Sequence, residues 1–302
     1  MAEGKAWAGT TYGNSWMHRW LIRLLRIFGI RALYAFMAIF VIPVCLIVNP
    51  GRKIIYKYFR EIWGLKPLTA FLKTYKNFYF FGQVVVDKFA MYAGKKFDVE
   101  IDGNEHYMRL TERPEGFILL SAHVGNYEIA GYTLKAEKKT FNALVFGGEK
   151  QSVMESRNRM FRDSNIRMIQ IGSDMSHLFE INKALSDGEI VSMPADRMFG
   201  ASRRMSHTFL GKEAAFPAGP FAVATSRSLD VLAVNVMKTQ SNRYKIFVTP
   251  LHYDKQAPRQ EQATQLLAAY TAELECILKQ YPEQWYNYFQ FWTYSPSENP
   301  SY

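Results

Sequence analysis

The sequence has little of several features that mark common classes of enzyme. It has two cysteines in 302 residues, Cys45 and Cys276, and neither falls in a metal-binding or redox spacing. We expect two free, buried thiols in a reducing compartment. The six histidines show no His-Glu-x-x-His pattern, and the chain has no Gly-x4-Gly-Lys or Gly-x-Gly-x-x-Gly loop. The sequence therefore predicts no metal and no resident cofactor.

Acidic residues are nearly missing from the first 60 positions, where nine basic residues stand against Glu3 alone. The remaining positions carry 28 basic and 26 acidic residues, so most of the net charge of +10 belongs to the N-terminal region. We find no nucleic-acid-binding module. Basic residues around an apolar segment favour an anionic membrane surface as the partner. We expect no nucleic acid as a partner.

Charge is also absent from residues 32–49, an apolar run of 18 positions that is close to the length of a membrane span. Before it, residues 16–31 place Arg opposite apolar side chains at helical spacing, which is typical of a helix in the membrane interface. Pro43 interrupts the run, and positive charge flanks both of its ends. These features favour a partly embedded anchor over a full span. We expect no cleaved signal peptide, because the run starts late and is long.

The pattern divides the chain into a helical, membrane-associating region at residues 1–96 and a catalytic region at residues 97–302. The first part is rich in aromatic residues that serve either as core or as lipid contacts. From residue 97 strand-like runs alternate with helical stretches, which predicts an α/β sheet with both faces covered. The predicted strands cover 98–102, 117–120, 141–146, 168–171, 189–193, 231–236 and 244–248. The predicted helices cover 127–136, 150–162, 175–186, 219–227 and 259–280.

The most informative segment carries His123 and Glu128, just past the apolar run at residues 116–120. In α/β folds, the ends of strands are where catalytic groups gather. A neutral imidazole takes a proton from a hydroxyl near neutral pH, and a carboxylate orients the ring and stabilises the imidazolium. Backbone amides near Gly125 and Asn126 are candidate donors to a developing oxyanion. The alternative is a histidine that only caps the next helix or packs in the core.

Four further segments become informative when taken with this pair. They are Ser-Arg-Asn-Arg at 156–159, Met-Pro-Ala-Asp-Arg at 193–197, Thr-Phe-Leu-Gly to Gly-Pro at 208–220, and Pro-Glu-Gln-Trp-Tyr at 282–286. With them, most of the chain resembles the bacterial lipid A late acyltransferases, the lauroyl and myristoyl transferases. His123 and Glu128 match that family's His-x4-acid motif. Asp196 matches the Asp of its Asp-Gln pair, and Arg197 stands where Gln is usual. The Glu-Gly-Thr-Arg motif of the glycerolipid branch is absent.

The resemblance implies a mixed, mostly parallel sheet flanked by helices and a membrane-bound O-acyltransferase at the cytoplasmic face of the inner membrane. It implies transfer of a fatty acyl chain from an acyl carrier protein thioester to a hydroxyl of a lipid A precursor. His123 would be the base and Glu128 its orienting partner. Arg157 and Arg159 would bind phosphates, although a solvated helix face explains them as well. Asp196 and Arg197 would take part in substrate recognition. Trp285 and Glu283 are expected to pack the C-terminal segment.

Three other functions stay open on the sequence. Because Arg197 departs from the family pattern, the same chemistry on another acceptor, such as an aminolipid, is the first. A non-catalytic, membrane-peripheral lipid-binding protein is the second. A hydrolase that passes the acyl chain to water is the third, since exclusion of water from a site leaves no trace in a sequence.

Overall fold

The computed structural model describes residue 23 and residues 28–134, 137–146, 165–172, 175–198 and 203–292. Most of the interfacial helix predicted at 16–31 lies outside the described residues, as does the helix predicted at 150–162. Arg157 and Arg159 lie outside them too.

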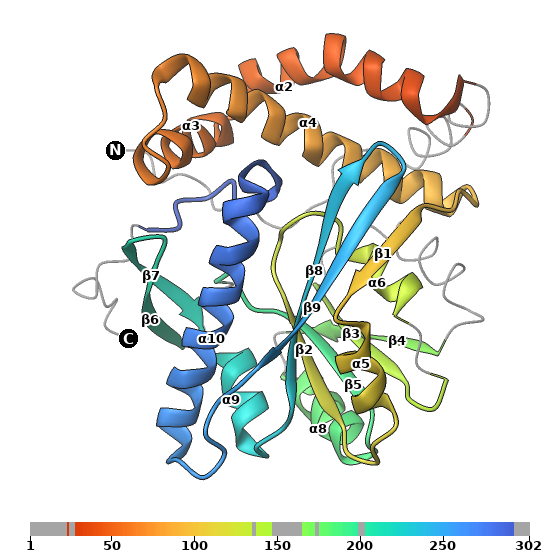
Figure 1. The fold of residues 1–302 in the computed structure, drawn as a ribbon, viewed down its shortest axis with the longest axis vertical. Helices are drawn as coiled ribbons and strands as arrows, with labels where there is room; N and C mark the ends of the chain where they lie inside the picture. The colour runs from red at the N-terminus through yellow and green to blue at the C-terminus, as the bar shows by residue number, and fades with distance from the viewer. Residues whose placement is uncertain are drawn as a thin grey trace.

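Within the described residues, the main sheet has seven strands in the order β1-β9-β8-β2-β5-β3-β4 (Figure 1). Neighbouring strands are parallel except β8 and β9, so the sheet is mixed and mostly parallel, as predicted. The strands are β1 (Asp98–Asp102), β2 (Phe117–Ser121), β3 (Phe141–Phe146), β4 (Ile166–Ile171), β5 (Ile190–Pro194), β8 (Val231–Gln240) and β9 (Arg243–Leu251).

Helices cover both faces of this sheet, which explains why β2 is a continuous apolar run. Successive side chains of a strand point to opposite faces. Phe117 and Leu119 accordingly join one buried cluster, with α5 and α6, while Ile118 and Leu120 join another, with α8, α9 and α10. The helices are α5 (Asn104–Thr111), α6 (Glu128–Thr133), α8 (Ser176–Ser186), α9 (Ala218–Ser226) and α10 (Arg259–Gln280).

A layer of helices built from the N-terminal part lies across one end of the sheet, over the β8–β9 hairpin (Figure 1). Its elements are the helix Phe28–Val48, which contains η1 (Met37–Val41) and α2 (Ile42–Val48), then α3 (Gly51–Lys57), η2 (Tyr58–Ile62) and α4 (Pro67–Tyr92). α2 packs against α4. Among the described residues, Phe28–Val48 is the one helix whose length and composition would allow it to cross a membrane.

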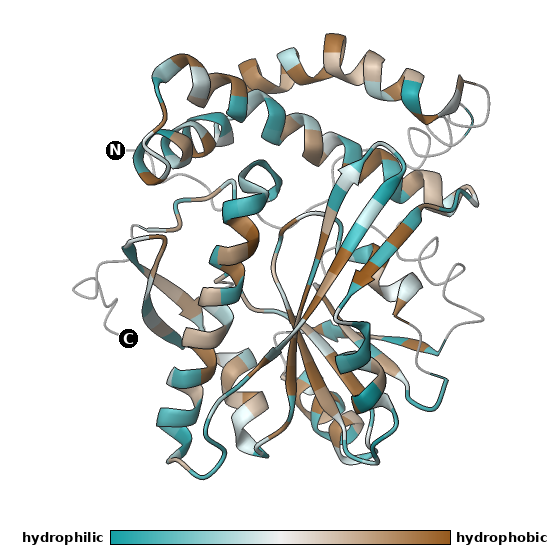
Figure 2. Cartoon of the chain, viewed as in Figure 1, coloured by the Kyte–Doolittle hydropathy of each residue, from teal (hydrophilic) through white to brown (hydrophobic). Residues whose placement is uncertain are grey.

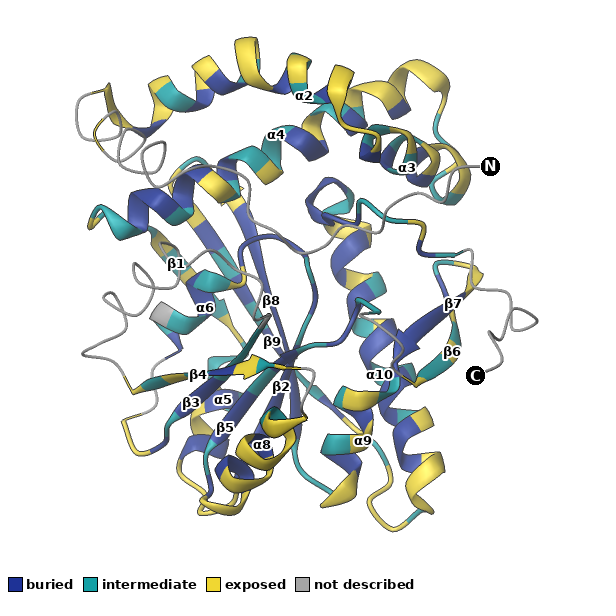
Figure 3. Ribbon diagram, turned by 180° about the vertical axis from the view of Figure 1, so that it is seen from behind, coloured by how far each residue is buried: buried dark blue, intermediate teal, exposed yellow. Residues whose placement is uncertain are grey.

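The Phe28–Val48 helix has two unlike sides. Ile30, Tyr34 and Met37, spaced by about one turn, are buried against the protein. The other side is apolar and exposed, as the hydrophobic colouring of Figure 2 and the exposed colouring of Figure 3 show together. Its exposed large side chains are Phe28, Phe36, Ile39, Phe40, Val41, Val44, Ile47 and Val48.

The change from helices to strands falls between Tyr92 and Asp98, close to the boundary drawn from the sequence. The helical layer and the sheet nevertheless share one buried cluster, in which Phe59 and Phe78 join Ile118 and Trp285. The division at residues 96 and 97 into two domains therefore stays a prediction.

The sequence analysis missed a two-stranded antiparallel hairpin and α5. The hairpin pairs β6 (Arg204–Phe209) with β7 (Lys212–Pro217) through a turn at Leu210 and Gly211, where φ is 51° and 79°. Leucine seldom adopts a positive φ, so the turn carries a weak sequence signal. The expectation for Cys276 was wrong: it lies on the outer side of α10 and is exposed, while Cys45 is half-buried.

Candidate active site

The segment that carries His123 is a tight turn at the carboxyl end of β2. The Gly125 amide donates to the Gln284 carbonyl at 2.8 Å, and the Asn126 amide donates to the Val236 carbonyl at 2.8 Å. Gly125 has a φ of +52°, and a Cβ added there would lie 1.8 Å from the Val236 oxygen. Only glycine fits this approach, so the turn is clamped between β8 and residue 284.

The carboxylate that holds the His123 ring is that of Asp196. Ser121 on β2 stands opposite Pro194 on the parallel neighbour β5, and His123 and Asp196 each lie two residues further along. The His123 Nδ1 atom is 2.7 Å from Asp196 Oδ1, and the His123 backbone amide donates to Asp196 Oδ2 at 2.9 Å. The Nε2 atom makes no hydrogen bond to a described residue. Two distant segments are thus joined into one His–carboxylate couple.

Asp196 is ionised in this setting although its exposed fraction is only 2%. Burial alone raises the pKa of a carboxyl group. The charge and hydrogen bonds of His123, with the charge of Arg197, outweigh burial and lower the pKa of Asp196 to about 2. Trp285 adds a third donor, because its Nε1 atom lies 3.3 Å from Asp196 Oδ2. An ionised, oriented carboxylate favours the tautomer with its proton on Nδ1, which leaves Nε2 as the base.

Glu128, the expected orienting partner of His123, is held elsewhere. Lys88 on α4 pairs with Glu128 Oε1 at 2.5 Å, and the Tyr92 hydroxyl donates to Oε2 at 3.2 Å. Glu128 begins α6, and α4 passes close enough for its side chains to reach it. The pairing drawn from the sequence is therefore corrected: Asp196, not Glu128, makes the hydrogen bond to the His123 ring.

The expected oxyanion donors are also corrected. The backbone amides of Gly125 and Asn126 both donate to carbonyl oxygens of the protein, so they are not available to a substrate. The Asn126 side chain is buried and its Nδ2 atom donates to the Tyr244 hydroxyl at 3.4 Å. These two residues shape the turn.

Arg197 lies next to the couple, between the turn and the segment that follows η3 (Pro282–Gln284). Its Nη2 atom donates to the Tyr286 carbonyl at 3.2 Å, and the guanidinium lies over the Phe289 ring at 5.4 Å. Burial lowers the pKa of Arg197, and the adjacent Asp196 carboxylate opposes that shift. A half-buried cation beside the His–Asp couple suits recognition of an anionic group.

Sequence reasoning did not assign a role in the site to two residues that have contacts there, Trp285 and Lys88. Trp285 was expected only to pack, and it does pack, but it also donates to Asp196. Lys88 carried no signal, since its role depends on where α4 lies. The Pro-Glu-Gln-Trp segment did stand out in the sequence, and its contact with the His123 turn explains why.

A histidine–carboxylate couple at the carboxyl ends of neighbouring parallel strands is an arrangement that α/β enzymes use for acid–base chemistry. The family model described as bacterial lipid A biosynthesis acyltransferase matches residues 76–293, well over half of the chain. The chain belongs to this family and is an acyltransferase.

Comparison with solved structures gives a match to the 1-acyl-sn-glycerophosphate (LPA) acyltransferase PlsC from Thermotoga maritima. The two chains are 14% identical, with a TM-score of 0.40, and the match covers 87% of this chain and 99% of that one. A comparison with curated proteins found no match.

Proposed function

We propose that this acyltransferase moves a fatty acyl chain from an acyl carrier protein thioester to a hydroxyl of a lipid A precursor, at the cytoplasmic face of the inner membrane. The observation that carries the proposal is the 2.7 Å contact between His123 Nδ1 and Asp196, with Nε2 left without a hydrogen bond to any described residue. Family membership supports lipid A synthesis as the setting.

The couple performs acyl transfer without a covalent enzyme intermediate. Nε2 of His123 takes the proton of the acceptor hydroxyl, and the oxygen attacks the thioester carbonyl. The imidazolium, stabilised by Asp196, then gives its proton to the departing sulfur, so that an ester and a free thiol result. A positioned base of this kind contributes roughly a hundred- to ten-thousand-fold in rate.

Glu128 keeps its proposed catalytic role in a changed form. Glu128 begins α6, five residues after His123, and its ion pair with Lys88 holds its carboxylate in place. We assign Asp196 the orientation of the ring, and Glu128 an electrostatic contribution to the imidazolium. Substituting Asp196 is therefore expected to cost more activity than substituting Glu128.

Arg197, with Arg157 and Arg159, is proposed to bind the phosphates of the acceptor or of the carrier's phosphopantetheine. Arginine suits this task because its planar fork matches phosphate oxygens in pairs. Gly125 and Asn126 support the site through the turn that they build, rather than by contact with the oxyanion.

We further propose that the Phe28–Val48 helix lies in the membrane interface and does not cross the bilayer. One side of it packs on the protein, and the exposed side is apolar except for Arg31 near its N-terminal end. A helix with these two sides is stable at the boundary of water and lipid. Lys53 and Lys57 on α3 are exposed and add attraction to anionic headgroups.

The experiment that tests the proposed function is a transfer assay in detergent with acyl carrier protein thioesters carrying a labelled acyl chain and a tetra-acylated lipid A precursor. Wild-type protein should label the lipid, and His123→Ala should reduce the rate by about a hundredfold or more. Asp196→Asn should lose more activity than Glu128→Gln. His252→Ala, at an exposed histidine away from the site, serves as the matched control and should match the wild type.

Undiminished transfer by His123→Ala would remove that residue from its role. Transfer to an aminolipid instead, found by offering total membrane lipid, would select the alternative acceptor that Arg197 favours. Wild-type protein that binds lipid but labels no acceptor would point to a non-catalytic lipid-binding protein.

A further inference from the structure

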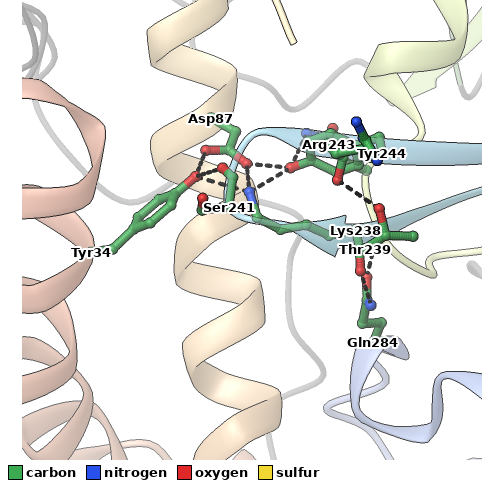
Figure 4. Close-up of polar contacts among 9 residues, drawn as sticks. Tyr34, Asp87, Lys238, Thr239, Ser241, Arg243, Tyr244 and Gln284 are labelled. Atoms are coloured by element: carbon green, nitrogen blue, oxygen red, sulfur yellow. Dashed lines mark hydrogen bonds and ion pairs between the residues drawn. The ribbon is translucent and has the colours of Figure 1, made fainter. Parts of the chain in front are cut away.

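A buried cluster of four polar side chains lies where the helical layer meets the sheet (Figure 4). Asp87 on α4 and Lys238 on β8 form an ion pair with side chains that are 0% and 2% exposed. The hydroxyls of Tyr34, from the Phe28–Val48 helix, and of Tyr244, on β9, both donate to Asp87. Side chains from three other elements, the Phe28–Val48 helix, β8 and β9, thus contact the Asp87 carboxylate on α4.

Every polar group of this cluster is satisfied. The three hydrogens of the Lys238 ammonium have three acceptors: Asp87 Oδ2, the Tyr34 hydroxyl at 2.9 Å and the Tyr244 hydroxyl at 3.3 Å. Burial raises the pKa of Asp87 and lowers that of Lys238, and the ion pair between them opposes both shifts. Buried ion pairs contribute little net stability because both charges lose their water. Their value lies in fixing one arrangement of the parts that they join.

The cluster is joined to the His123 turn by two routes. The Tyr244 hydroxyl accepts a hydrogen bond from the Asn126 side chain. The side chain of Gln284 holds the backbone amide and carbonyl of Lys238 at 2.9 and 2.8 Å, and the Gln284 carbonyl accepts the Gly125 amide. Both routes end within three residues of His123.

A third connection runs through α4 itself. Lys88, the residue after Asp87, pairs with Glu128. One turn of α4 therefore touches both the cluster and the second carboxylate of the site.

The other end of the cluster is the apolar helix. Tyr34 lies on the buried side of Phe28–Val48, and its hydroxyl is the polar contact of that helix with Asp87, Lys238 and the Ser241 carbonyl. Phe36, two residues later, lies on the exposed apolar side.

We propose that the Tyr34–Asp87–Lys238–Tyr244 cluster is a positioning device that holds the His123 turn at a set place relative to the lipid-facing helix. This inference rests on the proposed function, because it concerns how the catalytic base meets an acceptor that stands in a membrane. The four residues act through the turn and touch no substrate.

Two hydroxyl deletions between the same helices provide the test. Tyr34→Phe removes the contact of the apolar helix with the cluster. Tyr75→Phe is the matched control, since the Tyr75 hydroxyl on α4 donates to the Ala38 carbonyl of the same apolar helix and has no link to the cluster. Tyr244→Phe is the second variant, which removes the link between the cluster and Asn126.

Each variant is measured in two ways in the full-length protein. Amide hydrogen exchange is followed in the peptide that covers residues 123–128, and kcat and KM are measured with the acceptor in vesicles. Tyr34→Phe and Tyr244→Phe should exchange faster in this peptide and lose about tenfold in kcat with KM for the donor unchanged, because small displacements of a base are costly. Tyr75→Phe should match the wild type in both measurements.

Equal exchange and equal kcat in Tyr34→Phe and the wild type would overturn the proposal. Equal losses in Tyr34→Phe and Tyr75→Phe would overturn it as well, since any loosening of the helix would then suffice. If the wild type transfers no acyl chain while the exchange difference between the two variants persists, the proposed function fails and the positioning role stands.

Discussion

At the scale of single residues, the decisive arrangement is the contact of Asp196 with His123. The carboxylate accepts hydrogen bonds from the ring, from the backbone amide of His123 and from Trp285. These contacts hold the ring in one orientation before any substrate arrives. They also make Asp196 a contributor to stability, because its pKa is lower in the folded protein than the ordinary value for aspartate.

The sign of the pH effect follows from that lowered pKa. A carboxylate with a depressed pKa stabilises the fold above its unfolded value, near 4, and loses this contribution as the pH falls through about 2. Asp196→Asn should therefore lower the free energy of unfolding at pH 6. Between pH 6 and pH 3, the difference in the free energy of unfolding between the variant and the wild type should become smaller by about 1 kcal/mol. Denaturant unfolding at a series of pH values measures it. Glu105→Gln, at an exposed carboxylate, should show no such narrowing. If the difference in the free energy of unfolding stayed constant with pH, the partners of Asp196 would not lower its pKa in the folded protein.

At the scale of elements, the Phe28–Val48 helix combines a docked side with an exposed apolar side. Its apolar outer face extends over the length of the helix, and the side chains of Phe40 and Ile47 are 59% and 73% exposed. Exposed apolar surface of this extent marks an interaction site. The docked side keeps the helix on α4, so the lipid binding that we propose would involve the folded enzyme.

Charged substitutions on that face should weaken binding to lipid without unfolding the protein. Phe40→Asp and Ile47→Asp should each reduce the affinity for vesicles of anionic phospholipid by about ten- to a hundredfold, since each removes roughly 1.5–3 kcal/mol of apolar burial. Vesicle flotation measures the bound fraction. Phe179→Asp on α8, at a 79% exposed site far from this helix in Figure 1, is the control and should bind like the wild type. Loss of binding in the control alone would place the lipid surface elsewhere.

At the scale of the whole molecule, the net charge of +10 sets how partners approach. Acyl carrier proteins are acidic, and a basic enzyme attracts them over a distance that salt shortens. The basic excess lies in the first 60 residues, so in the proposed function this part of the chain would attract both the acidic carrier protein and anionic lipid.

Salt should therefore act on the carrier-bound donor and not on the chemistry. Raising the salt from about 20 mM to about 500 mM in detergent should raise KM for the carrier thioester by on the order of tenfold and leave kcat unchanged. A pantetheine thioester with the same acyl chain is the control, because it has no acidic protein surface, and its KM should stay constant. A KM for the carrier thioester that stays constant with salt would mean that electrostatic attraction does not contribute to binding of the carrier protein.

The sequence by itself determined the α/β class, the seven strands of the main sheet and the place of His123 after β2, because each depends on local periodicity. It also marked the apolar helix at the N-terminus. The missed hairpin shows the limit of local signals, since its turn needs a positive φ at Leu210 that only its packing explains.

The tertiary structure decided which residues meet. Asp196 reaches His123 because β2 and β5 are neighbours in register, so residues 73 positions apart end side by side. Lys88 reaches Glu128, and Asp87 reaches Lys238, because α4 crosses the end of the sheet. Such pairings depend on strand order and on helix placement, and both are fixed by the packing of the whole hydrophobic core. The His-x4-Glu motif singled out His123 in the sequence, and the three-dimensional arrangement shows that Asp196 is its hydrogen-bonding partner.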